Sequence, residues 1–245
     1  MIADIRTVMW KEFKEIFNMR GSKIASVFAM IVPAFLFGVI FPMQFAEQWT
    51  ESPLSLIVWI IVPFILISAL IADSFAGERE RHTLETLLSS RLSEKSILLG
   101  KICAVMVYAL TITAAIFIVG LITVNAANPG GGLLLFSPKI VLAGVLTGLV
   151  TASFSANFGV LVSLRAATVR QAQQTLGLAM FVLFFSPSLI IQFVPESYLD
   201  RLEDLFRAFD MNVTIGAVVI VLLAADAVLF LWALARFRRD KMLFD

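Results

Sequence analysis

The residues best placed to do chemistry lie in one short charged stretch, residues 77–88, which reads Gly-Glu-Arg-Glu-Arg-His-Thr-Leu-Glu-Thr-Leu-Leu. Leucines recur at i, i+3, i+4 and i+8 counted from Leu84, which places them on one narrow face of a helix. Glu78 with Arg81, and Arg81 with Glu85, have the spacing of helical ion pairs, each weak on a surface. A helix of this kind can lay its leucines in a groove of a soluble partner and hold its ends by charge. The stretch therefore predicts non-covalent docking.

The sequence offers little for covalent chemistry. It contains no Gly-x-x-x-x-Gly-Lys-[Ser/Thr] phosphate loop, since the nearest fragment, residues 21–23, lacks the upstream glycine. It contains neither a His-Glu-x-x-His motif nor a nucleophile elbow. The single histidine, His82, and the single cysteine, Cys103, have no second ligand of their kind with which to share a metal. We expect no catalytic residue, metal or cofactor in this chain, and no enzyme activity of its own.

The composition is that of a membrane protein. Of 245 residues, 60% are hydrophobic and 15% are charged, whereas soluble domains are about 45–50% apolar and about 25% charged. The net charge is +1 and no basic tract with interleaved aromatic residues occurs, which argues against a nucleic-acid partner. We therefore expect one integral membrane bundle.

The elements that must position the charged stretch are membrane-spanning helices. A bilayer core of about 30 Å needs about 20 apolar residues per helix, whereas a barrel would show alternating strands of about ten residues. The sequence predicts an all-α fold with six spans, at residues 24–42, 54–72, 97–124, 138–164, 171–194 and 212–235.

Prolines mark where several of these helices start or bend. Pro53 and Pro138 suit the first turn of a helix, with Ser52 and Ser137 as N-caps. Three further prolines fall inside spans and are expected to kink them, namely Pro33, Pro63 and Pro187.

Lysine and arginine gather on one side of the predicted membrane. Of the 19 such residues, the far side holds only Lys139, Arg201 and Arg207. The others lie in both terminal segments, in the loop with the charged stretch and in the loop after the fourth span. Because cytoplasmic loops are the basic ones, we expect a multi-pass protein of the cytoplasmic membrane with both termini, and the charged stretch, in the cytoplasm.

Two helices are predicted outside the spans. Residues 1–23 hold an amphipathic helix that lies on the inner leaflet, with Trp10 as an interfacial anchor, although a plain cytosolic helix is the alternative. Residues 195–211 form a short acidic amphipathic helix outside the cell. The single domain 1–245 thus comprises the interfacial helix and then, in order, segments 24–72 (two spans), 73–96 (the charged loop), 97–164 (two spans), 171–194, 195–211, 212–235 and the tail 236–245.

The charged stretch, followed by Leu98-Leu99-Gly100-Lys101, resembles the first cytoplasmic loop of type-two ABC exporter permeases. In that family an acidic–basic pair precedes Thr-Leu-Glu and Leu-Leu, and a Gly-Lys pair opens the next span. His82 stands where Gly or Lys is common and is assigned no role. The predicted layout of six spans, cytoplasmic ends and a short external helix is similar as well.

The resemblance implies the permease subunit of an ABC transporter, an exporter whose pathway lies at a permease dimer interface. Its partners would be ATP-binding-cassette ATPase subunits, which bind ATP and Mg, a second permease copy (homodimer or heterodimer) and membrane lipid. The loop helix would be the coupling helix, with an ordinary solvated helix as the alternative. The residues expected to contact the ATPase are Glu78, Arg79, Glu80, Arg81, Thr83, Leu84, Glu85, Leu87 and Leu88.

A carboxylate, Asp226, lies near the middle of the predicted sixth span. At that depth it costs about 2.5–3.5 kcal/mol on insertion scales, so it should face the bundle interior or water. One interpretation is a cation site or polar pathway lining that includes Asn157. The other is a helix-packing hydrogen bond to Asn157, Ser153 or Thr111. An alternative function is therefore a secondary transporter or channel subunit with Asp226 as its ion site.

Two further sets of residues in the spans suggest contacts. The resemblance places the dimer seam mainly at the first, second and fifth spans, so Phe181, Phe184 and Phe185 could line a central route or face lipid. Small residues also form a stripe along the fourth span, which allows close helix approach within the bundle or between protomers: Gly144, Gly148, Ala152, Ser155 and Gly159.

Overall fold

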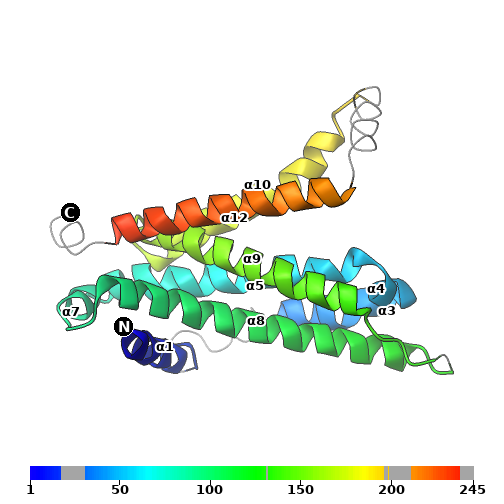
Figure 1. The fold of residues 1–245 in the computed structure, drawn as a ribbon, viewed down its shortest axis with the longest axis horizontal. Coiled ribbons are helices and arrows are strands. Elements are labelled where there is room, and N and C mark those ends of the chain that lie inside the picture. Colours follow the sequence, from blue (N-terminus) through cyan, green and yellow to red (C-terminus); the bar gives the residue numbers. More distant parts are fainter. Residues whose placement is uncertain (18–30, 131, 196–197, 199–210, 238–245) are drawn as a thin grey trace.

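The computed structural model describes residues 1–17, 31–130, 132–195, 198 and 211–237, and every regular element within these ranges is a helix (Figure 1). In chain order the elements are α1 (Ile2–Phe17), η1 (Leu36–Ile40), α3 (Phe41–Phe45), α4 (Glu47–Glu51), η2 (Pro53–Ser55), α5 (Leu56–Ala72), η3 (Asp73–Gly77), α6 (Glu78–Glu80), α7 (Leu84–Leu88), α8 (Glu94–Ala127), α9 (Pro138–Ser163), α10 (Val169–Ile191) and α12 (Met211–Arg236).

Three described helices are long and apolar enough to cross a membrane, namely Pro53–Glu80, Glu94–Ala127 and Pro138–Ser163. They overlap the predicted second, third and fourth spans. The 23-residue α10 and the 26-residue α12 overlap the fifth and sixth, and a shorter apolar helix, Ile31–Phe45, overlaps the first. The count of six spans stays a prediction. Residues 18–30 and 199–210, with most of the predicted external helix, lie outside the described residues.

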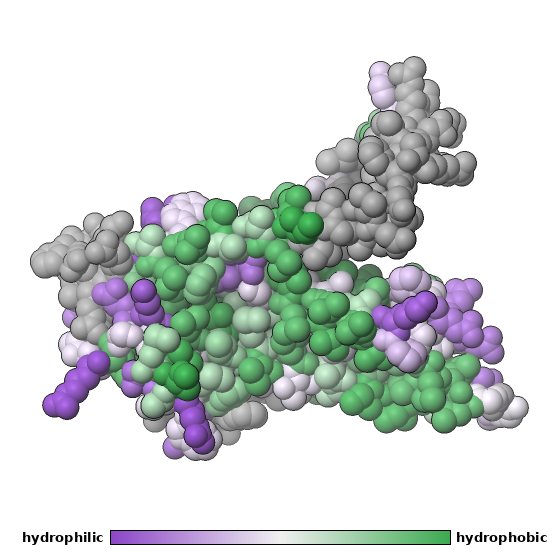
Figure 2. Space-filling view, viewed as in Figure 1, coloured by the Kyte–Doolittle hydropathy of each residue, from purple (hydrophilic) through white to green (hydrophobic). Residues whose placement is uncertain are grey.

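The polar ends and the apolar middle of the bundle are separated in space. Figure 2 shows a broad hydrophobic band over the middle of the face in view, with hydrophilic residues gathered mostly towards the two ends. The helices α1 and α7 lie at one end of the bundle, and α3 and α4 lie at the other (Figure 1). The charged stretch therefore shares its end with the N-terminal helix.

The expected N-caps are confirmed. Ser52 Oγ accepts a hydrogen bond from the Leu54 backbone N–H, and Ser137 Oγ accepts one from that of Ile140, both at 3.3 Å. Each serine is followed directly by a proline, which cannot donate and whose φ already suits the first turn. The starts of α5 and α9 are thus set locally.

The stripe of small residues on α9 packs inside the chain, against α5. A Cβ added at Gly144 would lie 2.6 Å from the Trp59 indole nitrogen, and one at Gly148 would lie 2.6 Å from the same ring. A Cβ at Gly159 would overlap Ile71. Of the two interpretations of this stripe, packing within the bundle is confirmed, and it fixes α5, which leads into the charged stretch.

The N-terminal helix packs closely against the start of α8. Val8 is 1% exposed, and a Cβ at Gly100 of α8 would lie 2.6 Å from Val8 Cβ. Trp10, in contrast, is 63% exposed and carries the Lys14 ammonium 5.2 Å from its ring centre. One face of α1 is therefore fixed to the bundle, and Trp10 is available for a membrane surface.

Candidate functional site

The charged stretch begins on a π-helical turn, η3, at the end of α5. A π-helical turn leaves backbone groups without their usual i→i−4 partners, and such turns often mark functional sites. Ser163 of α9 donates its hydroxyl to the Ala72 carbonyl at 3.1 Å and accepts from the Ala76 N–H at 2.9 Å. Lys101 of α8 donates to the Ser74 carbonyl at 2.8 Å. Two neighbouring helices thus hold the turn.

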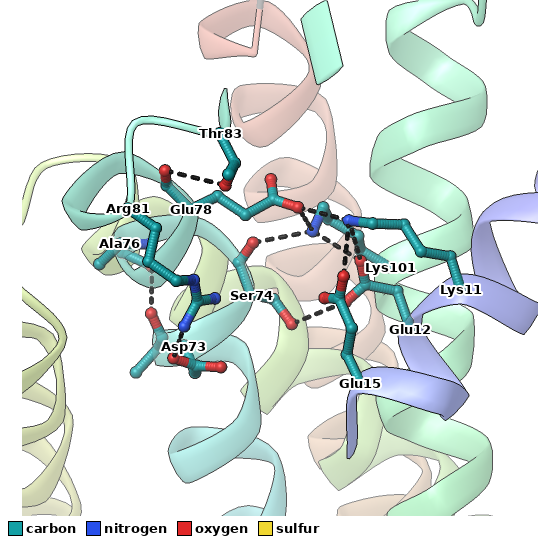
Figure 3. A network of polar contacts seen from close by, with 12 residues as sticks. Lys11, Glu12, Glu15, Asp73, Ser74, Ala76, Glu78, Arg81, Thr83 and Lys101 are labelled. Atoms are coloured by element: carbon teal, nitrogen blue, oxygen red, sulfur yellow. Dashed lines mark hydrogen bonds and ion pairs between the residues drawn. The ribbon is translucent and has the colours of Figure 1, made fainter. Parts of the chain in front are cut away.

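Beside this turn lies a group of four charged side chains, the buried charge cluster, made of Lys11, Glu12, Glu78 and Lys101 (Figure 3). Lys101 Nζ lies 2.7 Å from Glu12 Oε1 and 3.0 Å from Glu78 Oε1. Lys11 Nζ lies 2.7 Å from the same Glu78 oxygen. Ser74 donates its hydroxyl to Glu12 Oε2 at 3.2 Å. The cluster therefore joins α1, η3, α6 and α8.

Three of the four members of the cluster are almost closed to water. The Lys101 side chain is 0% exposed, and those of Glu12 and Glu78 are each 3% exposed. Burial of a single charge costs several kcal/mol. In this cluster the cost is offset because two ammonium ions pair with two carboxylates. The ring of Phe75 adds a cation–π contact, with its centre 5.3 Å from Lys101 Nζ.

The partly exposed Lys11 stays charged at neutral pH. Burial alone lowers the pKa of Lys11, but its hydrogen bond to Glu78 and the charges of Glu78, Glu12 and Glu15 outweigh burial and raise the pKa above its ordinary 10.5. Among the described residues, these three carboxylates approach closely enough to hold a metal ion. The place of a cation is already taken, because Lys11 Nζ lies within 3.6 Å of all three.

The next three charged residues bind three different elements. Arg79 donates to the Leu164 and Ala166 carbonyls at 2.8 and 2.9 Å, just beyond the C-terminus of α9. Glu80 accepts from the Val169 N–H at the N-terminus of α10 at 3.1 Å. In both cases the charge suits the helix dipole. Arg81 pairs with Asp73 of η3 at 3.2 Å, on the surface.

The predicted ion pairs Glu78–Arg81 and Arg81–Glu85 are wrong. The helix does not run through the stretch: α6 ends at Glu80, and His82 has a φ of 55°, in the left-handed region. Residues three and four apart in this stretch are therefore not helical neighbours. Glu78 pairs with Lys11 instead, and Arg81 pairs with Asp73. Glycine adopts a positive φ readily, and His82 stands where Gly or Lys is common in the family that the charged stretch resembles.

The described leucines of this face pack against the chain itself. Leu84 is 6% exposed and belongs to the main core, and Leu87 and Leu92 pack against that core. The side chain of Leu88 is outside the described residues. Around α7, the described side chains that remain exposed are polar, namely His82, Thr83, Glu85, Thr86, Ser89 and Arg91.

The carboxylate in the predicted sixth span is part of a packing contact. Asn157 Nδ2 donates to Asp226 Oδ1 at 2.8 Å, and Ser153 Oγ donates to Oδ2 at 2.5 Å. Thr111 instead donates to the Val107 carbonyl of its own helix. Two of the three expected packing partners are thus present, and they join α9 to α12.

The predicted pathway phenylalanines of α10 differ in their surroundings. Phe184 packs edge-on against Phe64 of α5, with ring centres 5.5 Å apart. Phe181 is 52% exposed. The side chain of Phe185 lies outside the described residues.

Glu12 and Lys101 belong to the site although neither was predicted as a site residue. Each carries a usable signal, since Glu12 lies in the apolar stripe of an amphipathic helix and Lys101 lies inside an apolar run. A lone charge in such a setting is rarely buried without a partner. Two lone charges of opposite sign, each in an apolar setting, mark Glu12 and Lys101 as candidates for such a pair without showing that they meet.

The family model of the ABC-2 type transporter matches residues 3–194. The matched range includes α1, the charged stretch and the helices α8, α9 and α10. No curated protein matches this chain at a significant level.

Proposed function

The chain belongs to the ABC-2 type transporter family, and on this premise we propose that it is the permease subunit of an ABC exporter in the cytoplasmic membrane. ATP and Mg are bound and hydrolysis is done by separate ATP-binding-cassette subunits, since this sequence has no phosphate loop of its own. A second permease copy completes the pathway, and both termini lie in the cytoplasm with the basic residues.

The observation that supports this proposal best is how the charged stretch is anchored. Its first residues bind α1 and α8 through Glu78, the end of α9 through Arg79 and the start of α10 through Glu80. A displacement of this segment therefore acts on four helices at once. That is the property required of an element that converts closure of two ATPase subunits into movement of the spans.

The surface offered to the ATPase is the polar rim of α7. Glu85 and Thr86 point away from the core and are exposed, whereas Leu84 is buried. We expect the ATPase to recognise this rim by hydrogen bonds and charge, and the leucines to hold α7 in place. Substitution of Leu84 would disturb the fold as well as docking, so Glu85 is the sharper test.

The second permease copy is expected to cover the apolar face of α10. Leu178, Phe181, Val182 and Leu183 are each more than half exposed. The helix α10 corresponds to the predicted fifth span, which is one of the three spans to which the family resemblance assigns the dimer seam. A pathway between two such faces would be largely apolar.

The docking proposal is tested by charge reversal at one exposed carboxylate. The permease is co-expressed with its ATP-binding-cassette subunit, and the ATPase that co-purifies with Glu85→Arg is compared with that retained by the wild type. The matched control is Glu51→Arg, the same change at an exposed residue of α4, at the opposite end of the bundle. Loss of ATPase with Glu85→Arg alone is expected. Equal retention by both variants, with Thr86→Arg also silent, would contradict the docking surface.

A further inference from the structure

A groove separate from the buried charge cluster opens between α9, α10 and α12. Its volume is about 360 Å³. Its apolar wall is formed by Phe158, Leu161, Val162 and Leu229, and Arg165 and Trp232 also line it. It lies by the C-terminal end of α9, where Arg79 binds the Leu164 carbonyl, so it is at the basic end of the bundle.

The cation of this groove is the Arg165 guanidinium. Arg165 is exposed, and its guanidinium carbon lies 5.4 Å from the centre of the Trp232 ring. Among residues 1–17, 31–130, 132–195, 198 and 211–237 it forms no ion pair. Glu80, the carboxylate bound at the start of α10, accepts from the Val169 N–H instead. The donors of Arg165 are thus available to a ligand.

A second cation lies on the same face of α12. Arg236 follows Trp232 by four residues, and residues four apart are neighbours on a helix surface. Leu229, three residues before Trp232, continues the stripe into the apolar part of the groove. The face therefore runs from an aliphatic side chain through an indole to a guanidinium.

We propose that this groove binds a phospholipid with an anionic headgroup. Arg165 donates to the phosphate, for which the planar guanidinium is well suited. Trp232 lies at the level of the headgroup, as tryptophans at membrane interfaces do, and one acyl chain covers the wall around Leu229. Basic pockets between membrane helices on the cytoplasmic side are a known type of lipid headgroup site. The lipid then fills the gap between α9, α10 and α12.

The apolar wall selects a lipid over free phosphate as the occupant. An inorganic anion would use only the cations Arg165 and Arg236 and gain nothing from Leu229 or Val162. A lipid uses both the cations and the apolar wall. Its binding should therefore depend on the charge of the headgroup and also on the space that the groove leaves for an acyl chain. These two dependences can be separated by substitution.

The experiment measures lipid binding to the full chain, purified in detergent, by native mass spectrometry during titration with phosphatidylglycerol or phosphatidylcholine. Arg165→Ala is expected to weaken phosphatidylglycerol binding roughly tenfold or more, as for the loss of one charge-assisted hydrogen bond. Arg91→Ala, which removes an exposed cation from the same end of the bundle, is the matched control and should bind as the wild type does. Leu229→Trp, or Val162→Trp if the first variant fails to fold, fills the groove and should displace the lipid while Arg165 stays in place.

Each other outcome overturns the proposal. Equal losses in Arg165→Ala and Arg91→Ala would show general attraction between charges. Retention of phosphatidylglycerol by a folded groove-filling variant would show that the apolar wall is not used. A preference for phosphatidylglycerol that appears only after deletion of residues 238–245 would indicate that this segment, and not a lipid, occupies the groove. A fall in the dimer fraction of the groove-filling variant, without a change in lipid binding, would indicate that a second copy of the chain occupies the groove.

Discussion

Removal of the Lys101 ammonium group should destabilise the bundle strongly. The change Lys101→Met keeps the apolar stem and removes the ammonium, which lies 2.7 Å from Glu12, 3.0 Å from Glu78 and 2.8 Å from the Ser74 carbonyl. Two carboxylates that are each 3% exposed are then left with Lys11 as their remaining ammonium partner. Removal of one member of a buried ion pair costs about 3–5 kcal/mol, because the remaining charge is uncompensated.

The expected loss is large enough to measure in detergent by thermal unfolding. For a chain of this length, 1 kcal/mol lowers the melting temperature by about 2–4 °C, so Lys101→Met should lower it by about 6–20 °C. The control is Lys95→Met, the same change at an exposed position of α8, for which about 0.5 kcal/mol or less is expected.

A second substitution separates charge from packing. Glu12→Gln removes one buried carboxylate and leaves Glu78 paired with Lys11, so the double variant Glu12→Gln/Lys101→Met should melt above Lys101→Met alone. The coupling expected between contacting residues is about 0.5–3 kcal/mol. If Lys101→Met has the same melting temperature as Lys95→Met, the buried charge cluster does not contribute the stability assigned to it. The same conclusion follows if the double variant has no higher melting temperature than Lys101→Met.

Three further predictions concern other contacts of the bundle. Gly148→Leu should destabilise the protein by about 1–3 kcal/mol through overpacking against α5, measured by thermal unfolding, whereas Gly177→Leu should not, since an added Cβ there meets nothing within 4 Å. Arg79→Gln should cost about 1.5–3 kcal/mol, the worth of hydrogen bonds from a charged group, and the exposed control Arg91→Gln should be neutral in the same assay. Asp226→Asn should leave the transport rate and its pH dependence unchanged, because the carboxylate serves helix packing; an altered pH profile would favour an ion site.

The parts of the structure that could be predicted are those that depend on short spacings. Ser52 and Ser137 cap the helices that follow them because an N-cap needs only the next three residues. The small residues of α9 form a stripe because the helical period is fixed, and a stripe of that kind has few uses besides close packing. The partners of Asp226 were predictable because a carboxylate in an apolar helix restricts the choice to the few polar residues at the same depth.

The buried charge cluster could not be predicted in this way. Its members are 67 and 89 residues apart in the pairs Lys11–Glu78 and Glu12–Lys101, and only the packing of α1 against α8 brings them together. For the leucines of the charged stretch, the face could be predicted but its contact partner could not. Their spacing defines a face, but it does not say whether the chain or a partner covers that face.

The contacts around the charged stretch differ enough in strength to say where it can bend. The pair Arg81–Asp73 is exposed, with side chains 52% and 35% accessible, and such pairs contribute about 0–1 kcal/mol. The cluster at Glu78, three residues earlier, is buried and costs several times more to break. Between Glu78 and α7 the helix is interrupted at His82, whose left-handed backbone already departs from helical geometry. Under the proposed function, a force applied at Glu85 would break the Arg81–Asp73 pair first and rotate α7 about His82. Movement beyond that would be transmitted through Glu78 to α1 and α8, because sliding past the cluster would separate buried charges.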